Sequence, residues 1–262
     1  MEWHDVRSGN EIKRRLQSGG HVAGAFVRIP AVEIVEMLAH GGSDFVILDT
    51  EHTPVGWETL AAMVLAADAS GTVPIVRVPS GPRDLISRAL DTGAHGIMVP
   101  QVEDAETTAV AVAATRYGPG GSRGTAGTRR MGYGMKMGYP EYVAAANDSV
   151  LTLLQVETQA GVDSLESIVA VGGMDCIFIG LTDLSVSLGH PGEYHHPDVE
   201  IAVERVISVC DGAGIPVGVP ASSAAMAAEY VARGARLVAG SDMGMFGPAA
   251  RSFLEGVHAS FE

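Results

Sequence analysis

The feature that most constrains the fold is an alternation of short β-branched segments with longer segments of helical period. Apolar runs bounded by turns are typical of buried strands, and apolar residues spaced three and four apart are typical of amphipathic helices. We predict eight strands, at 21–27, 44–50, 73–79, 95–100, 150–157, 175–181, 215–220 and 235–241. Helices are expected at 31–40, 57–69, 82–92, 103–115, 159–170, 198–212 and 222–233, with a last one near 243–257.

Eight strand–helix units without a linker predict one α/β domain over residues 1–262, a TIM (β/α)8 barrel, whose usual size this length fits. A doubly wound open sheet is the alternative. We also expect an N-terminal helix at about 8–18. One Gly-rich, basic segment, 116–140, is too long for an ordinary connection, so we expect a functional loop, an interface arm or a mobile surface excursion. It lacks the spacing and the lysine of a Walker phosphate loop.

Composition excludes several classes of protein. A net charge of −14 argues against nucleic-acid binding, which depends on clustered Lys and Arg. The two cysteines, Cys176 and Cys210, are far apart and favour core positions in a reducing cytoplasm over a disulfide or zinc site. No apolar run approaches a membrane span, and the first residues do not resemble a signal peptide. A soluble cytoplasmic protein without a membrane partner is expected.

Polar residues gather where the predicted strands end. In a parallel barrel the carboxyl ends of all strands open on one face, where catalytic groups lie. The residues at these ends are Asp49, Glu51 and His52 after strand two, Arg77 on strand three, Gln155 and Glu157 on strand five, and Gly180 to Asp183 after strand six. Charge at a single strand end is common in surface turns, but convergence of several ends predicts a functional site.

Two of these carboxylates, Glu157 and Asp183, close consecutive strands, which in a parallel sheet lie about 4.8 Å apart. Two like charges so placed need a cation or a proton between them, and a hard divalent ion such as Mg²⁺ or Mn²⁺ is the simplest occupant. The alternative is that Asp183 caps a helix and Glu157 is solvated. The only lysines, Lys13 and Lys136, lie outside the predicted strands, so no strand offers a Schiff-base amine.

Several motifs together resemble the HpcH/HpaI family of metal-dependent (class II) pyruvate aldolases, whose name-giving member is hydroxy-oxo-heptanedioate aldolase. They are DFVILDTEHTP, PIVRVP, ALDTGAHGIMVPQVEDAE, YGPGGSRG, LLQVETQAGVDSLESIVAVGGMDCIFIGLTDLSVSLGHPG and LVAGSD, in order over roughly residues 20 to 245. The resemblance implies a barrel and a homo-oligomer, commonly a hexamer or trimer of dimers in which the C-terminal helix is exchanged between subunits.

The resemblance also implies roles for individual residues. Glu157 and Asp183 match the ligands of a divalent metal, Mg²⁺ or Mn²⁺ with Co²⁺ and Zn²⁺ as alternatives, and Gln155 lies beside them. Pyruvate is expected to chelate this ion next to the backbone of Gly180, Leu181, Thr182 and Asp183. Arg77 matches the arginine that contacts the keto oxygen, and His52 matches the residue assigned to acid–base work.

Other positions are ambiguous or depart from the pattern. Asp91 matches a carboxylate paired with the histidine, but it ends a helix on the opposite face, so we expect it to reach a His52 only in a neighbouring subunit. Asp49 and Glu51 are nearer partners for His52 or for metal-bound waters. Leu181 and Thr182 replace the commoner Pro-Ala, and Arg28 stands where relatives often have a small polar residue.

The expected activity is cleavage or formation of 4-hydroxy-2-oxo acids through an enolate of pyruvate, or of another 2-oxo acid, and an aldehyde. The alternative is related enolate chemistry, such as a citrate-synthase-like condensation or oxaloacetate decarboxylation. A barrel that only binds or assembles is a third hypothesis. The tandem His195 and His196 are interpreted as structural, because Pro197 and Asp198 resemble a helix start.

Overall fold

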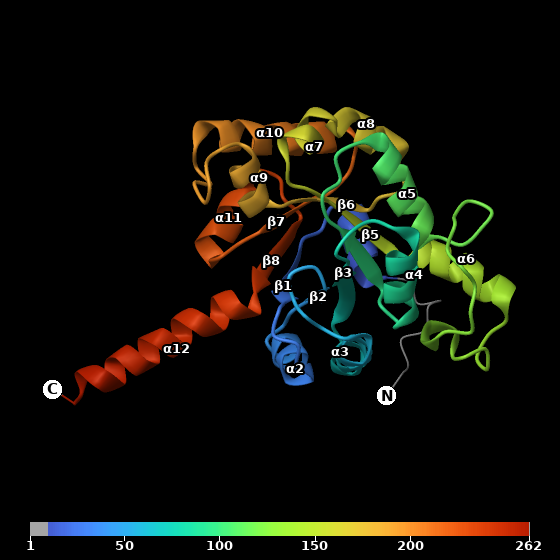
Figure 1. The fold of residues 1–262 in the computed structure, drawn as a ribbon, viewed down its shortest axis with the longest axis horizontal. Helices are drawn as coiled ribbons and strands as arrows, with labels where there is room; N and C mark the ends of the chain where they lie inside the picture. The colour runs from blue at the N-terminus through green and yellow to red at the C-terminus, as the bar shows by residue number, and fades with distance from the viewer. Residues whose placement is uncertain (1–9, 262) are drawn as a thin grey trace.

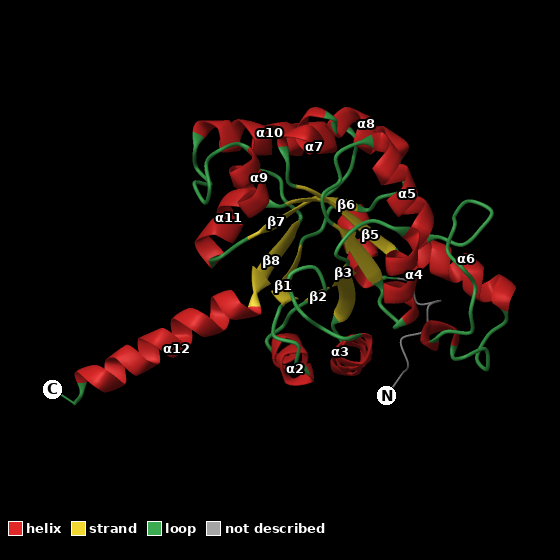
Figure 2. Ribbon diagram, in the orientation of Figure 1, coloured by secondary structure: helices red, strands yellow, loops and turns green. Residues whose placement is uncertain are grey.

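A computed structural model describes residues 10–261 of the chain. Eight parallel strands form one closed barrel in sequence order, and β1 pairs with β8 (Figures 1 and 2). The strands are β1 Val22–Val27, β2 Phe45–Asp49, β3 Val73–Arg77, β4 Gly96–Val99, β5 Leu151–Val156, β6 Cys176–Ile179, β7 Val217–Pro220 and β8 Leu237–Ser241. The predicted barrel is thus confirmed, and the closure excludes an open sheet.

The strands separate two apolar layers because successive side chains point to opposite faces. On β5, Leu151 and Leu153 face the barrel interior, whereas Leu154 and Val156 pack against the surrounding helices. Residues buried on both faces explain why these strands appear in the sequence as continuous apolar runs. By the same alternation, the inward position of β5 at its carboxyl end belongs to Gln155.

Helices surround the barrel between the strands (Figure 2). They are α1 Glu11–Gln17, α2 Val32–His40, α3 Trp57–Ser70, α4 Arg83–Asp91, α5 Ala105–Thr115, α6 Tyr139–Ser149, α7 Gln159–Asp163, α8 Leu165–Val171, α9 Leu181–Ser187, α10 Pro197–Gly212, α11 Ala224–Ala232 and α12 Asp242–Ala259. The stretch predicted as one helix at 159–170 is two short helices, which divide at Ser164. Helices α6 and α9 were not predicted.

The N-terminal helix α1 packs against the amino ends of the strands. Asn10 accepts the backbone N–H groups of Ile12 and Lys13 and so starts the helix. Ile12 and Leu16 are buried in the same apolar cluster as the barrel interior. Residues 8 and 9 of the predicted helix lie outside the described residues.

The Gly-rich segment 116–140 contains more structure than its sequence suggests. A 3-10 turn at Arg129–Met131 interrupts it, and α6 begins at Tyr139, where its end was expected. Tyr117, Met131, Met137 and Tyr142 form a separate buried apolar cluster. The segment therefore has a small core of its own, which it shares with α6.

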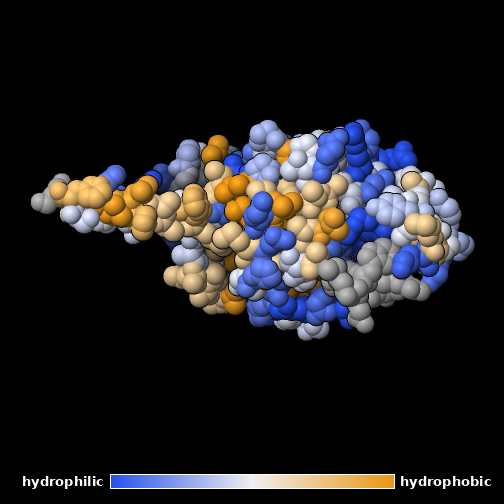
Figure 3. Space-filling view, turned by 90° about the horizontal axis from the view of Figure 1, so that it is seen from below, coloured by the Kyte–Doolittle hydropathy of each residue, from blue (hydrophilic) through white to orange (hydrophobic). Residues whose placement is uncertain are grey.

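The C-terminal helix α12 leaves the barrel after its first turn and extends away from it (Figure 1). Asp242 is the only buried residue of this helix. Its exposed apolar side chains form a continuous stripe along the projecting helix, seen in Figure 3. Across residues 10–261, none of the helices combines the length and apolar character that a bilayer crossing requires.

Candidate active site at the carboxyl ends of the strands

Strand alternation brings the predicted polar residues to one layer at the barrel mouth. Asp49 and Arg77 are paired residues of β2 and β3, two positions beyond the inward Ile47 and Ile75. Gln155 lies two positions beyond the inward Leu153 on β5, and Glu157 lies two positions beyond Gln155, just after the strand ends. The convergence predicted from the sequence is therefore present in the structure.

Arg77 is held by two carboxylates. Its Nε and Nη2 donate to the two oxygens of Asp49 at 3.1 and 2.8 Å, and its Nη1 lies 3.1 Å from Glu51 Oε2. The guanidinium also lies over the ring of Phe26, 4.9 Å from its centroid. Burial raises the pKa of Asp49, but Arg77 and two backbone N–H groups outweigh this effect and leave that pKa below its ordinary value.

Glu51 and His52 form the outer edge of this cluster. His52 is half exposed, and its Nε2 lies 3.6 Å from Glu51 Oε2, a distance of electrostatic contact but not of a hydrogen bond. Among the described residues no donor makes a hydrogen bond to the buried Glu51 Oε2, although Arg77 Nη1 lies 3.1 Å from it. Burial raises the pKa of Glu51, and Arg77 and His52 oppose that shift.

Glu157 is 2% exposed, so the alternative that it is a solvated surface group is wrong. Its Oε1 accepts the backbone N–H of Gln101 at 2.8 Å, and its Oε2 accepts from Gln155 Nε2. Burial raises the pKa of Glu157 to about 7. The nearby charges of Asp183 and Glu51 also raise this pKa, whereas the hydrogen bond from Gln101 lowers it. The carboxylate thus lies in an environment that favours a positive charge beside it.

Asp183 lies in the first turn of α9 and is exposed, and its charge is close enough to Glu157 to raise the pKa of that group. It does not cap that helix, because the N-cap residue is Gly180 and no side chain accepts a capping hydrogen bond. Leu181 is buried, and Thr182 Oγ1 lies 3.2 Å from Tyr194 Oη. Two carboxylates of which one is buried, with the unpaired amide oxygen of Gln155 beside them, form an oxygen donor set that fits a hard divalent ion.

Gly180 was predicted as a substrate-binding position, but its close approach to Glu157 and the backbone conformation of Gln101 were not predicted. Gly180 faces Glu157 so closely that a Cβ there would lie 2.6 Å from Glu157 Cβ and 2.8 Å from Gln155 Nε2. Gln101 has φ +53°, a left-handed conformation that turns its N–H toward Glu157. A glycine directly after an apolar strand was a signal for the first, whereas nothing in the sequence around Gln101 indicates the second.

Asp91 lies apart from the other predicted residues. It ends α4, and one of its oxygens accepts from Arg123 Nη2 at 2.8 Å. Within one chain the structure pairs it with Arg123 and not with His52, so a role at a histidine across a subunit boundary stays a prediction.

The tandem histidines also lie apart. His196 is the N-cap of α10 and accepts the Asp198 N–H, whereas His195 Nδ1 lies 3.1 Å from Glu200. The predicted helix start at Pro197 is confirmed. Both imidazoles have contacts that explain them without a catalytic role.

Comparisons with known proteins agree with this geometry. A hydroxypyruvate/pyruvate aldolase of Paraburkholderia phytofirmans is 38% identical over 237 residues, which cover 88% of this chain and 90% of that protein. A 5-keto-4-deoxy-D-glucarate aldolase of Klebsiella pneumoniae is 37% identical over 248 residues, covering 94% and 96%.

Solved structures give the same result. A crystal structure of an HpcH/HpaI aldolase/citrate lyase family protein from Burkholderia cenocepacia superposes with a TM-score of 0.90 at 37% identity, covering 95% of this chain and 99% of that one. The profile of the HpcH/HpaI aldolase/citrate lyase family matches residues 23–247. The chain belongs to the HpcH/HpaI aldolase/citrate lyase family.

Proposed function

We propose that this chain is a divalent-metal-dependent aldolase that cleaves or forms 4-hydroxy-2-oxo acids through the enolate of pyruvate. Relatives that share 37–38% of its residues over most of its length are aldolases, and the chain is accordingly a carbon–carbon lyase. The observation that carries the proposal is the buried Glu157 beside Asp183, in a barrel mouth that also contains Arg77 and His52.

Glu157 and Asp183 would hold the metal, and Gln155 would orient groups around it. The resemblance to metal-dependent pyruvate aldolases implies a divalent metal, and Mg²⁺ or Mn²⁺ suits these oxygen donors, with Co²⁺ and Zn²⁺ as alternatives. When bound, the ion supplies Lewis-acid stabilisation of negative charge on the substrate oxygen.

Arg77 would bind the keto oxygen of the 2-oxo acid. Asp49 accepts from its Nε and Nη2, and the Glu51 carboxylate lies 3.1 Å from its Nη1, so its orientation is set before substrate arrives. Preorganised donors of this kind stabilise developing charge without reorganisation. The N–H groups of Leu181 to Asp183, which have no partner within α9, would bind the substrate carboxylate.

His52 would move the proton. It is half exposed at the mouth, with Glu51 as its nearest carboxylate, and an imidazole can exchange protons near neutral pH. Removal of a methyl proton from pyruvate gives the enolate, which then adds to the aldehyde. The same groups operate in reverse during cleavage.

Exchange of the pyruvate methyl hydrogens for deuterium tests this proposal without an aldehyde. Parent protein with Mn²⁺ should exchange them, as followed by proton NMR, and EDTA should stop the exchange until Mg²⁺, Mn²⁺, Co²⁺ or Zn²⁺ is added back. Glu157→Ala and Asp183→Ala should each lose the exchange at least about 100-fold because each removes half of the ion's protein ligands. Glu166→Ala, on the surface of α8, is the matched control.

Exchange at the parental rate in Glu157→Ala and Asp183→Ala would refute the site. Full activity of the parent protein in EDTA would refute the metal dependence. A condensation with acyl-CoA or decarboxylation of oxaloacetate would use the same enolate, but two relatives at 37–38% identity are aldolases, which favours an aldehyde acceptor.

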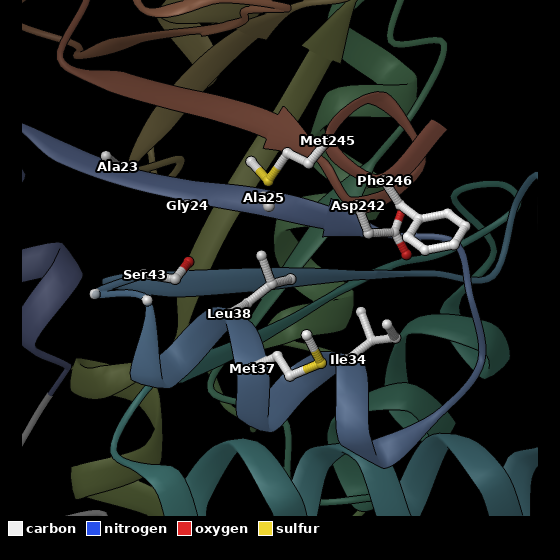
Figure 4. A pocket seen from close by; sticks show the side chains of 12 residues that line it. Ala23, Gly24, Ala25, Ile34, Met37, Leu38, Ser43, Asp242, Met245 and Phe246 are labelled. Atoms are coloured by element: carbon white, nitrogen blue, oxygen red, sulfur yellow. The ribbon is translucent and has the colours of Figure 1, made fainter. Parts of the chain in front are cut away.

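We infer that the protein works as a homo-oligomer in which α12 crosses to a partner copy. Two grooves, of about 530 and 470 Å³, flank the first turns of α12, one against α2 and the other against α11. In Figure 4, Ile34, Met37 and Leu38 of α2 point into the first groove beneath Met245 and Phe246. An apolar stripe on a projecting helix and an apolar gap in the helical layer are complementary surfaces, and three such dimers would form a hexamer.

A further inference from the structure

Arg28 is a charged residue at the barrel mouth that has no role in the proposed reaction so far. It directly follows β1, two positions after the inward Phe26, so it continues the alternation that also places Asp49 and Arg77. Its own backbone N–H and that of Ile29 donate to Asp242 Oδ2 at 2.9 and 2.8 Å. The backbone beneath the side chain is therefore fixed.

The guanidinium of Arg28 lies near the carboxylate of Asp49 but donates no hydrogen bond to it. Its Nε lies 3.7 Å from Asp49 Oδ2, beyond hydrogen-bond distance, and its side chain is 42% exposed. Asp49 already accepts from Arg77 and from the N–H groups of Glu51 and His52. Within residues 10–261 no acceptor takes a hydrogen bond from the Arg28 side chain, which leaves its donors available to a ligand.

The place of Arg28 relative to Arg77 defines what that ligand can be. Arg28 Nε and Arg77 Nη2 approach the same oxygen of Asp49, at 3.7 and 2.8 Å, so they cannot be farther apart than those two distances combined. Arg77 is assigned to the keto oxygen of the enolate. An acceptor aldehyde must place its carbonyl carbon beside that enolate, and a group two or three carbons farther along then reaches Arg28.

Resting on the proposed function, we propose that Arg28 is a specificity-determining residue that selects acceptor aldehydes with a carboxylate at their far end. A guanidinium matches a carboxylate with two parallel hydrogen bonds. A phosphate dianion is disfavoured here, because the neighbouring carboxylates of Asp49 and Glu51 repel a second negative charge. Arg28 is also the one guanidinium without a hydrogen-bonded partner among the described residues at this mouth.

The test compares two aldehydes of equal length. Steady-state aldol addition to pyruvate is measured with 4-oxobutanoate and with butanal, and the readout is the ratio of their kcat/KM values. The parent protein should prefer 4-oxobutanoate, and Arg28→Met should lower the ratio about 10- to 100-fold, as expected for a hydrogen-bonded charge pair. Arg28→Lys keeps the charge but not the two parallel bonds, and its ratio should fall between these values.

The control is Arg14→Met, a surface arginine paired with Glu11, which should keep the parental ratio. An unchanged ratio in Arg28→Met would overturn the assignment of Arg28. The same ratio of kcat/KM values is measured for glyceraldehyde 3-phosphate against glyceraldehyde. If Arg28→Met lowers that ratio more than it lowers the ratio of 4-oxobutanoate to butanal, the choice of a carboxylate is overturned. Deuterium exchange into pyruvate needs no acceptor, so failure of that exchange in the parent protein marks failure of the proposed function instead.

Discussion

Gly180 packs against Glu157, one of the two carboxylates assigned to the metal, and leaves no room there for a larger residue. It is the N-cap of α9, and its N–H donates to Val156 O at 3.0 Å, which fixes its distance from β5. A Cβ at this position would lie 2.6 Å from Glu157 Cβ and even nearer to Glu157 Oε2. Real Cβ atoms essentially never come this close to another heavy atom. The carboxylate would have to turn away.

We therefore expect Gly180→Ala to lower the affinity for Mn²⁺ about 10- to 100-fold, the usual effect of disturbing groups that orient metal ligands. Isothermal titration calorimetry with the metal alone measures it. Gly212→Ala on α10, where a Cβ meets nothing within 4 Å, is the control. Equal affinities in the two variants would show that Glu157 can shift without cost.

The raised pKa of Glu157 makes metal binding depend on pH. Burial holds its pKa at about 7, so below that pH the folded protein binds a proton that the metal must displace. We expect Mn²⁺ affinity to rise about tenfold per unit as pH increases to 7, and to level off above it. Calorimetry in two buffers of different ionisation enthalpy should detect release of one proton at pH 6 and less at pH 8. A pH-independent affinity would contradict the environment described for Glu157.

At the scale of elements, the strand and helix pattern was predictable because periodicity reports burial directly. The eight strands lie where the apolar runs are, and β5 differs from its predicted 150–157 by one residue at each end. Helix α6 was missed because the segment before it is rich in glycine, and glycine does not reveal that Tyr117 and Tyr142 build a local core. The positive φ of Gln101 was unpredictable, since side-chain patterns do not encode it.

The junction of β8 with α12 depends on one carboxylate. Asp242 is 4% exposed, accepts the N–H groups of Arg28 and Ile29, and so connects the first and last strands at the barrel mouth. Its side chain thus holds backbone and also lines the groove between α12 and α2.

Asp242→Ala should lower the free energy of unfolding by about 1–3 kcal/mol, because two backbone donors lose their acceptor. Asp242→Asn keeps one acceptor oxygen and should lose less. Urea unfolding followed by circular dichroism gives both values, with exposed Asp211→Ala expected within about 0.5 kcal/mol of the parent protein. A cost for Asp242→Ala no larger than that of Asp211→Ala would mean that this contact does not stabilise the junction.

At the scale of the whole molecule, the projecting α12 is the element that a single chain cannot account for. Most helical stability in proteins comes from packing of an apolar face rather than from helix propensity. Yet Phe246 and Phe253 are 67% and 70% exposed, and the helical layer over β8 and β1 is open on both sides of the helix. Large exposed apolar surfaces of this kind mark interaction sites.

We expect the double variant Phe246→Asp/Phe253→Asp to have half the mass of the parent protein in size-exclusion chromatography with light scattering. Two carboxylates would have to be buried in the partner's groove, and desolvating them without a cation costs more than the apolar contact returns. Any contact elsewhere between subunits would survive, so a hexamer should become a trimer and a dimer should become a 27.2 kDa monomer. Glu255→Ala, a polar change on the same helix, should keep the parental mass. A parent protein that is already monomeric, or a double variant of unchanged mass, would show that α12 does not join the subunits.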